Sequence, residues 1–228
     1  MTSHGANRHI RRLTTPRAAA FAGVLFAVLF ATALILIRLA LPEGAAPASQ
    51  WLDVGSTKIK ISTILMPFAG IMFLWFIGVV RDGFGMFEDK FFSTVFIGSG
   101  LLFLAMIFAS SAVGAGLVAS AGAIDADHNS AVATFGRMML LALSKTYALR
   151  MGAVFMMSLA TIWLRTGLMP RWLVLVTYVS AIGLLIVSDI SMWIALAFPI
   201  WVLVVSLLVL VRAGVIDLPR HEPEERGT

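Results

Sequence analysis

The chain has little charge and no cysteine. Only 13% of its 228 residues are charged, whereas a soluble domain averages about 25%. The absence of cysteine excludes disulfides, thiolate metal sites and iron–sulfur ligation. The four histidines, His4, His9, His128 and His221, fall between or beyond the long apolar runs. A haem held by two membrane histidines is therefore excluded.

Carboxylates are also missing from the middle of every long apolar run. The nearest is Asp189, in a short turn between the last two runs. A carboxylate proton relay therefore has no residues to build it. Walker loops, HExxH and Gly-x-Ser-x-Gly patterns are absent, so we identify no enzymatic site. Asp125, Asp127 and His128 are more typical of a solvated loop than of an ion site, and we expect neither metal nor cofactor.

Apolar residues are what the chain has in excess. They make up 60% of it, against roughly 45–50% in a soluble domain. Each of six runs is close to the length of about 20 residues that a spanning helix needs. The sequence therefore predicts an all-α polytopic membrane helix bundle of six transmembrane helices over residues 18–212, with disordered tails at 1–17 and 213–228. The predicted spans are 18–41, 59–80, 92–119, 137–164, 172–188 and 190–211.

The positions of Lys and Arg predict the orientation. With six spans, eleven basic residues fall on the side that holds both termini, and four fall on the other side. Positive residues favour the cytoplasmic side, so we expect both termini in the cytoplasm of a bacterial cell, with the protein in the inner (plasma) membrane. The net charge of +5 is thus topogenic, and we expect no nucleic-acid partner. The four residues on the other side are Arg38, Lys58, Lys60 and Arg137.

Two sets of small residues recur at helical spacing and predict close helix contacts. Packing inside the bundle is one interpretation, and homo- or hetero-oligomerisation through these stripes is the other. The first stripe is Ala19, Gly23, Ala27 and Ala31; the second is Ala112, Gly116 and Ser120, beside Ser110 and Gly114.

Two prolines fall inside predicted spans. Pro67 and Pro199 each remove a helix hydrogen bond, so we expect both helices to kink. Thr63, four residues before Pro67, can help to satisfy the freed carbonyl region.

The fourth predicted span carries two cations well inside its ends. Lys145 lies about 12 Å and Arg150 about 20 Å along the helix from Arg137. Because a cation in hydrocarbon is costly, each marks either a partner or a working site. The two side chains are five residues apart and point about 140° from each other in a regular helix. Asp189 is placed to pair with Lys145, and Tyr147 lies within one turn of Arg150.

Three interpretations of Arg150 are open. In the first, Arg150 is bonded to helix carbonyls and to the hydroxyls of Thr177, Tyr178 and Ser180, which the sequence places at its depth. Alternatively, residues 131–148 form an amphipathic outer helix and the span begins near Tyr147. In the third, Lys145 and Arg150 accept an anionic ligand such as a lipid head group or a carboxylate.

The turn after the fourth span carries a recognisable motif. It reads Arg165-Thr-Gly167-Leu-Met-Pro170-Arg171-Trp172, and Tyr147-Ala-Leu-Arg150-Met lies upstream. Over residues 136–212 the chain resembles uncharacterised bacterial six-span membrane proteins of the DUF4386 type that share an RTGxxPRW hairpin. The resemblance implies six helices in a bacterial plasma membrane and no established activity.

The sequence therefore favours an integral membrane scaffold or accessory protein. The alternative is a binder or transporter of an amphipathic anion through Arg150 and Lys145, with Tyr147 and Asp189 as further site residues. The expected partners are the lipid bilayer and an anionic lipid.

Overall fold

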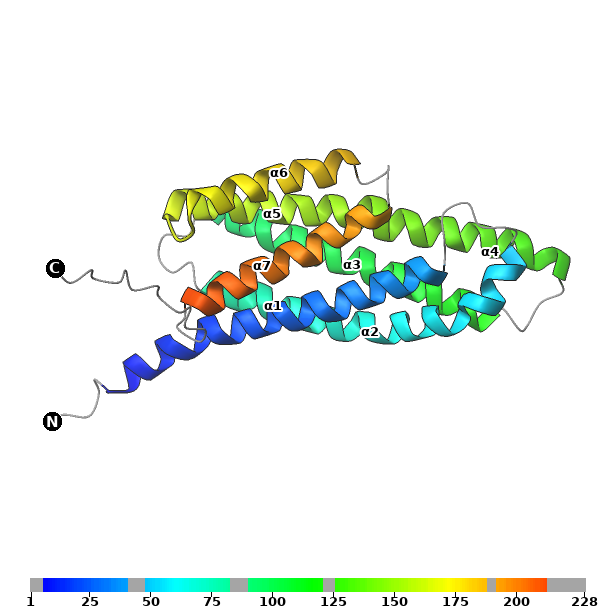
Figure 1. The fold of residues 1–228 in the computed structure, drawn as a ribbon, viewed down its shortest axis with the longest axis horizontal. Helices are drawn as coiled ribbons and strands as arrows, with labels where there is room; N and C mark the ends of the chain where they lie inside the picture. Colours follow the sequence, from blue (N-terminus) through cyan, green and yellow to red (C-terminus); the bar gives the residue numbers. More distant parts are fainter. Residues whose placement is uncertain (1–5, 41–47, 83–89, 121–125, 188–191, 213–228) are drawn as a thin grey trace, which may run out of the picture.

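The computed structural model describes residues 6–40, 48–82, 90–120, 126–187 and 192–212, and within these ranges it contains helices and turns but no strand. The first three helices are long (Figure 1). They are α1 (Ala6–Ala40), α2 (Ala48–Asp82) and α3 (Lys90–Ser120).

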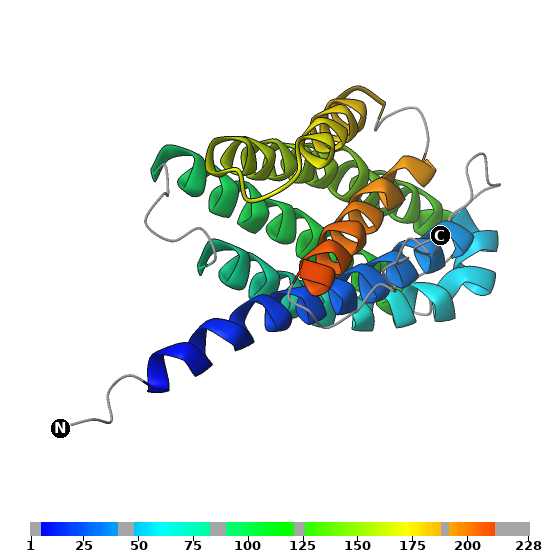
Figure 2. The same ribbon diagram turned by 60° about the vertical axis from the view of Figure 1, so that its left-hand side comes forward.

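The fourth helical rod is continuous but not regular. It consists of α4 (Ala126–Leu141), a π-helical turn η2 (Ala142–Tyr147) and α5 (Ala148–Thr166). The chain then turns back through α6 (Arg171–Val187), and a 3-10 turn η3 (Met192–Leu196) leads into α7 (Ala197–Arg212). In Figure 2, α6 lies along α5, and α7 crosses α1.

Within the described residues, five helices are long and apolar enough to cross a membrane, which confirms the prediction of an all-α bundle of membrane type. The predicted fifth span corresponds to α6, which has 17 residues and is shorter than the other five candidate spans. The predicted first span lies inside a longer helix, because α1 begins at Ala6. The six spans, the two tails and their orientation stay predictions.

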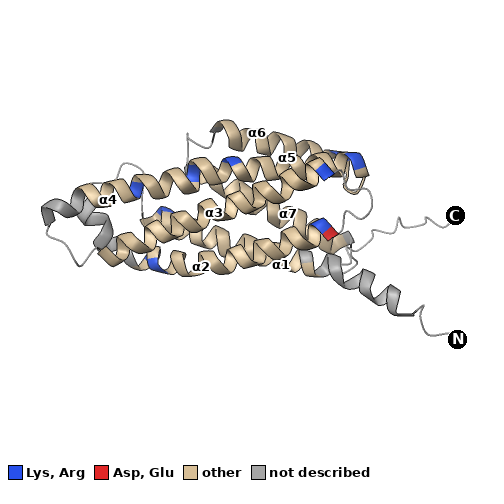
Figure 3. Ribbon diagram, turned by 180° about the vertical axis from the view of Figure 1, so that it is seen from behind, with Lys and Arg blue, Asp and Glu red and all other residues tan. Residues whose placement is uncertain are grey.

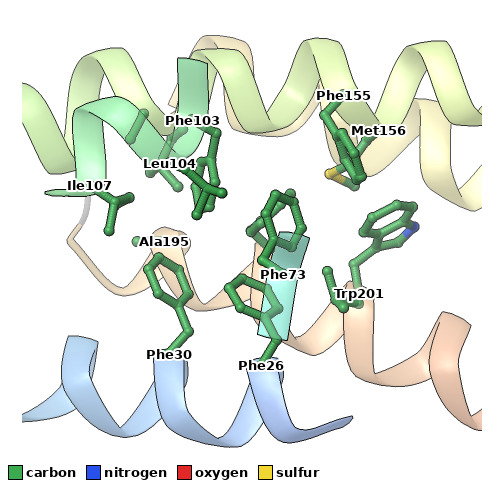
Figure 4. Close-up of a cluster of buried hydrophobic side chains, with 14 of the residues drawn as sticks. Phe26, Phe30, Phe73, Phe103, Leu104, Ile107, Phe155, Met156, Ala195 and Trp201 are labelled. Carbon is green, nitrogen blue, oxygen red and sulfur yellow. The ribbon is translucent and has the colours of Figure 1, made fainter. Parts of the chain in front are cut away.

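The centre of the bundle is filled by phenylalanine rings (Figure 4). The ring of Phe73 lies 4.6 Å from that of Phe26, 5.3 Å from Phe103, 5.2 Å from Phe155 and 5.8 Å from Phe198. All five side chains are fully buried. They come from α1, α2, α3, α5 and α7, so one aromatic cluster joins five helices.

Small residues mark where helices approach most closely. Gly23 of the first stripe is buried, and a methyl group added there would collide with Ser206 of α7 and Phe76 of α2. On α3, Gly114 is buried, but Gly116 is exposed and a methyl group added there would meet nothing. The first stripe therefore packs inside the bundle at Gly23, whereas Gly116 of the second stripe faces outward. Whether these stripes mediate oligomerisation stays a prediction.

The two prolines occupy different kinds of position. Pro67 lies inside α2, as predicted, and the carbonyl of Thr63 that it leaves without a backbone donor faces Ser111 of α3, whose hydroxyl oxygen lies 3.5 Å away. The Thr63 hydroxyl itself bonds the carbonyl of Lys60. Pro199 instead falls in the first turn of α7, where proline is well tolerated.

Candidate anion site at the π turn

The π turn interrupts the fourth rod at Lys145. At its end, the Ala148 N–H donates to the carbonyl of Leu143, five residues back rather than four. Such turns are rare, and those that occur are frequently found at functional sites. The sequence Ala-Leu-Ser-Lys-Thr-Tyr contains neither glycine nor proline, so the local sequence did not predict the turn.

Two serine hydroxyls hold the start of this turn. The carbonyl of Leu140 accepts a hydrogen bond of 2.7 Å from Ser144 Oγ, one turn on, and one of 3.0 Å from Ser110 Oγ of α3. The neighbouring Ser111 reaches towards α2. Adjacent hydroxyls of α3 thus contact α2 and the fourth rod, and one of them ties the start of the π turn to α3.

The candidate side chains lie on a part of the rod that is less buried than most of α5. Lys145 and Arg150 are half-buried, and Tyr147 is 56% exposed. None of the six residues of η2 is buried, whereas eleven of the nineteen residues of α5 are. A π turn also holds more residues than an α turn, so Lys145 and Arg150 diverge by less than the expected angle of about 140°.

The end of α6 lies close to this part of the rod. Thr161 of α5 and Tyr178 of α6 share a hydrogen bond of 2.6 Å between their hydroxyls. Gly152 is nine residues before Thr161, and Val187, the last residue of α6, is nine residues after Tyr178. Because the two helices are antiparallel, the end of α6 lies level with Gly152. Arg150 therefore lies just beyond the part of α5 that α6 covers, and Figure 1 shows α5 and α4 continuing past that end.

This register corrects the set of hydroxyls expected around Arg150. Tyr178 bonds Thr161, which is eleven residues, or about 16 Å, from Arg150 along α5. Thr177 is fully buried and accepts a hydrogen bond of 2.9 Å from Trp201 Nε1. The prediction was wrong for Thr177 and Tyr178, because the register of the two helices places both residues nearer to the turn between α5 and α6 than to Arg150.

The other side of α5 at this level is closed. A methyl group added at Gly152 would lie 3.2 Å from the ring of Phe198 and 3.6 Å from that of Phe103. Both rings belong to the aromatic cluster in the centre of the bundle. Arg150 therefore lies two residues from a glycine that packs directly against this cluster.

Three cations from three helices share a level beyond the π turn. Ser62 of α2 donates to the carbonyl of Ala33 in α1, with a distance of 3.0 Å. Counting five residues from this bond along each of the two antiparallel helices places Arg38 within one residue of the level of Lys58. The side chain of Arg38 is only 8% exposed. In the sequence Arg38 is only a topogenic charge, and nothing among its neighbours in the chain signals this burial.

Arg137 of α4 lies at the same level. A methyl group on Gly114 of α3 would lie 3.5 Å from Ile59 of α2, and one on Gly136 of α4 would overlap Leu117 of α3. These contacts place Arg137 level with residues 58 and 59. We call Arg38, Lys58 and Arg137 the Arg137 layer.

A second cation layer lies at the opposite end of the bundle. The guanidinium of Arg165 lies 4.8 Å from the centre of the Phe92 ring, two residues into α3. We call Arg81, Lys90, Arg165 and Arg171 the Arg165 layer. Figure 3 shows basic residues at both ends of the bundle and along α4 and α5 between them. Among residues with described side chains, the only carboxylate is Asp82, beside Arg81.

Four residues named from the sequence cannot be placed. The side chains of Asp125, Asp127, His128 and Asp189 lie outside the described residues. The structure therefore brings Lys145, Tyr147 and Arg150 onto one partly exposed segment, and the predicted pairing of Asp189 with Lys145 stays a prediction.

Comparisons with known proteins leave this site as the main guide to function. No family model matches the chain, and neither the curated proteins nor the solved structures include one similar to it. The resemblance to six-span proteins with an RTGxxPRW hairpin stays a prediction.

Proposed function

We propose that this protein is an integral membrane protein that binds an amphipathic anion through Lys145 and Arg150. The observation that carries the proposal is the position of two half-buried cations, Lys145 in the π turn and Arg150 three residues beyond its end, between two layers of basic residues. Cations within a membrane segment are expensive and are typical of functional sites. Tyr147 adds a hydroxyl group and an exposed ring.

The spacing of the two cation layers supports a membrane between them. Arg137 and Arg165 are 28 residues apart, which corresponds to about 40 Å along the rod. Lys58 and Arg81, on α2, are separated by about 34 Å. A bilayer is about 30 Å thick in its hydrocarbon core and about 40–45 Å with its head groups. We place the six helices across this layer, with both termini on the cytoplasmic side of a bacterial inner membrane.

The aromatic cluster favours binding over transport through the centre of the bundle. Five phenylalanine rings from five helices fill the interior level with Arg150. A polar molecule would have to displace these rings to cross along the bundle axis. The site therefore serves a ligand that stays on the outer surface of the bundle.

A scaffold or accessory role is the second candidate. It is supported by the same cluster, because a densely packed core gives a rigid bundle, and by the outward-facing Gly116 of α3. In a scaffold, Lys145 and Arg150 would serve only the folding of the rod.

Native mass spectrometry of protein purified from its membrane separates the two candidates. We expect the wild-type protein to carry a bound anionic lipid or acid, and Arg150→Gln to lose at least about nine-tenths of it. Arg171→Gln, at the exposed start of α6, is the matched control and should retain the ligand. If Arg150→Gln keeps the same ligand and only unfolds more easily, the scaffold role stands and the binding function is rejected.

A further inference from the structure

We propose that the bundle has a lateral gate between α7 and the α5–α6 pair, held closed by Trp201, which admits the acyl chain of a neighbouring lipid to the aromatic cluster. The inference goes beyond the proposed function and does not involve the anion site. It depends on three observations: the order in which the helices pack, the side chains that lie between α7 and α5, and one hydrogen bond between α7 and α6.

The helices pack in an open arc. Along this arc, α6 packs on α5, α5 on α3, α3 on α2, α2 on α1, and α1 on α7. The two ends of the arc, α6 and α7, are consecutive in the chain, and consecutive elements are usually adjacent in space. Yet the described backbones of α6 and α7 approach each other at only a few residues, as do those of α5 and α7. We call this boundary, between α7 on one side and α5 with α6 on the other, the α7 seam.

The helices on each side of the α7 seam are held to a neighbour of their own. On one side, Thr161 of α5 and Tyr178 of α6 share a hydrogen bond of 2.6 Å. On the other side, α7 packs so closely on α1 that a methyl group added at Gly23 would overlap the hydroxyl oxygen of Ser206. Figure 2 shows α6 beside α5 and α7 beside α1. Movement at the seam therefore separates two helix pairs rather than a single helix from the bundle.

Aromatic side chains fill the α7 seam between α7 and α5. The centre of the Trp201 ring lies 6.3 Å from that of Phe155 and 6.2 Å from that of Trp163, both on α5. One turn earlier on α7, Phe198 packs against Gly152 of α5. Figure 4 shows Trp201 reaching from α7 towards Phe155. Each ring turns about two side-chain torsions, so these contacts open with less rearrangement than a close contact between two helix backbones.

One hydrogen bond joins α7 to α6 across the seam. Trp201 Nε1 donates to Thr177 Oγ1 over 2.9 Å, and both residues are buried. The net contribution of one neutral hydrogen bond changes an equilibrium by about two- to tenfold. The bond therefore favours the closed seam without making it permanent.

The surfaces outside and inside the α7 seam are apolar. Val176, next to Thr177, is 47% exposed, and Val204, one turn after Trp201, is 40% exposed. Behind Trp201 lie the fully buried phenylalanine rings of the central cluster. In the proposed membrane, the molecules outside the seam are lipids, whose chains are as apolar as leucine. Such a surface favours an acyl chain over a polar head group.

Distance measurements between paired spin labels test the gate in lipid nanodiscs. Because the chain has no cysteine, Val176→Cys with Val204→Cys gives one pair across the seam. Phe68→Cys with Leu101→Cys, at exposed residues of α2 and α3, gives the control pair. Trp201→Phe keeps a ring and removes the N–H donor. We expect it to raise the population of longer distances across the seam by about two- to tenfold and to leave the control pair unchanged.

The acceptor of the bond provides a matched variant. Thr177→Val removes the acceptor and keeps the shape of the side chain, so it should have the same effect as Trp201→Phe. The double variant should add little, because either change alone already removes the bond. Unchanged distances across the seam in both single variants would overturn the gate. An equal change in the control pair would also overturn it, since the whole bundle would then have loosened.

Fluorescence quenching tests the entry of an acyl chain. With the other five tryptophans replaced by phenylalanine, Trp201 is the only indole, and lipids with bromine on their acyl chains quench an indole that they contact. Trp201 is only 5% exposed, so we expect weak quenching, and at least about twofold stronger quenching when Thr177→Val is added. A seam that opens in the distance measurement without stronger quenching would overturn the acyl chain as ligand. The distance measurement needs no tryptophan replacements and tests the gate even if the single-tryptophan variant does not fold.

Discussion

The π turn and α5 are consecutive parts of one helical rod and both pack against α3, yet they are buried to different extents. Eleven of nineteen residues in α5 are buried, and none of the six in η2 is. The difference follows from neighbouring helices, since α5 packs against α3 and α6 and touches α7, and α6 ends level with Gly152. The comparison teaches that the exposure of a membrane cation is decided by where the next helix stops.

The largest expected effect is at the aromatic cluster, against which α5 is buried. Phe73→Ala removes a fully buried ring that contacts four others. We expect a loss of about 3–5 kcal/mol in unfolding free energy, the usual cost of such a cavity. Unfolding in mixed detergent measures it. Phe91→Ala, at a ring that is 67% exposed, is the control; equal losses for the two variants would show that the cluster does not stabilise the bundle.

A methyl group at a helix contact should cost less. Gly23→Ala forces Ser206 and Phe76 away from α1, and overpacking of this kind costs about 1–3 kcal/mol. Gly116→Ala adds the same group where nothing lies within 4 Å, so its stability should change little. Thermal unfolding of the two variants gives the comparison. A greater loss for Gly116→Ala would reveal a partner on the outer face of α3.

The serines that hold the π turn should contribute a smaller amount. Ser110→Ala removes the hydrogen bond from α3 to the Leu140 carbonyl, and we expect a loss of about 0.5–1.5 kcal/mol. Ser144→Ala removes the second bond to the same carbonyl. Because the two hydroxyls share one acceptor, their effects on unfolding free energy should not add. Strict additivity in the double variant would show that the two bonds act independently.

The smallest effect on stability is expected at Tyr147, the exposed residue at the end of η2. Tyr147→Phe removes an exposed hydroxyl, and the unfolding free energy should change by no more than about 0.5 kcal/mol. Leu149→Ala, two residues on and only 1% exposed, should cost about 2–5 kcal/mol. Similar losses for the two variants would mean that Tyr147 is covered, and the contrast between η2 and α5 would disappear.

Much of the helical framework was predictable because its signal is local. Apolar runs bounded by charges predicted α3 to within two residues at its start and one at its end. The same logic placed α6 correctly, although at 17 residues it is shorter than the other candidate spans. Run length and charge are properties of one segment, and one sequence is enough to assess them.

The site could be predicted only in part. Lys145 and Arg150 stood out because cations are rare in apolar runs, but their surroundings depend on contacts between helices. The start of the π turn is bonded to Ser110, thirty residues before Leu140, and the register of Arg150 against α6 is set by contacts such as the one between Thr161 and Tyr178. The burial of Arg38 likewise arises from packing rather than from its own neighbours in sequence.

The hydrogen-bond pattern of η2 also makes this segment tolerant of a change in chain length. A π turn accommodates one residue more than the α-helix around it would need. Deleting a single residue there, such as Thr146, should therefore leave a regular helix with α4 and α5 in nearly the same rotation about the rod axis. Deleting one residue from the regular helix of α5 would instead rotate the part beyond it by about 100° and turn its buried face the wrong way. The number of residues is therefore more tightly constrained in α5 than in η2.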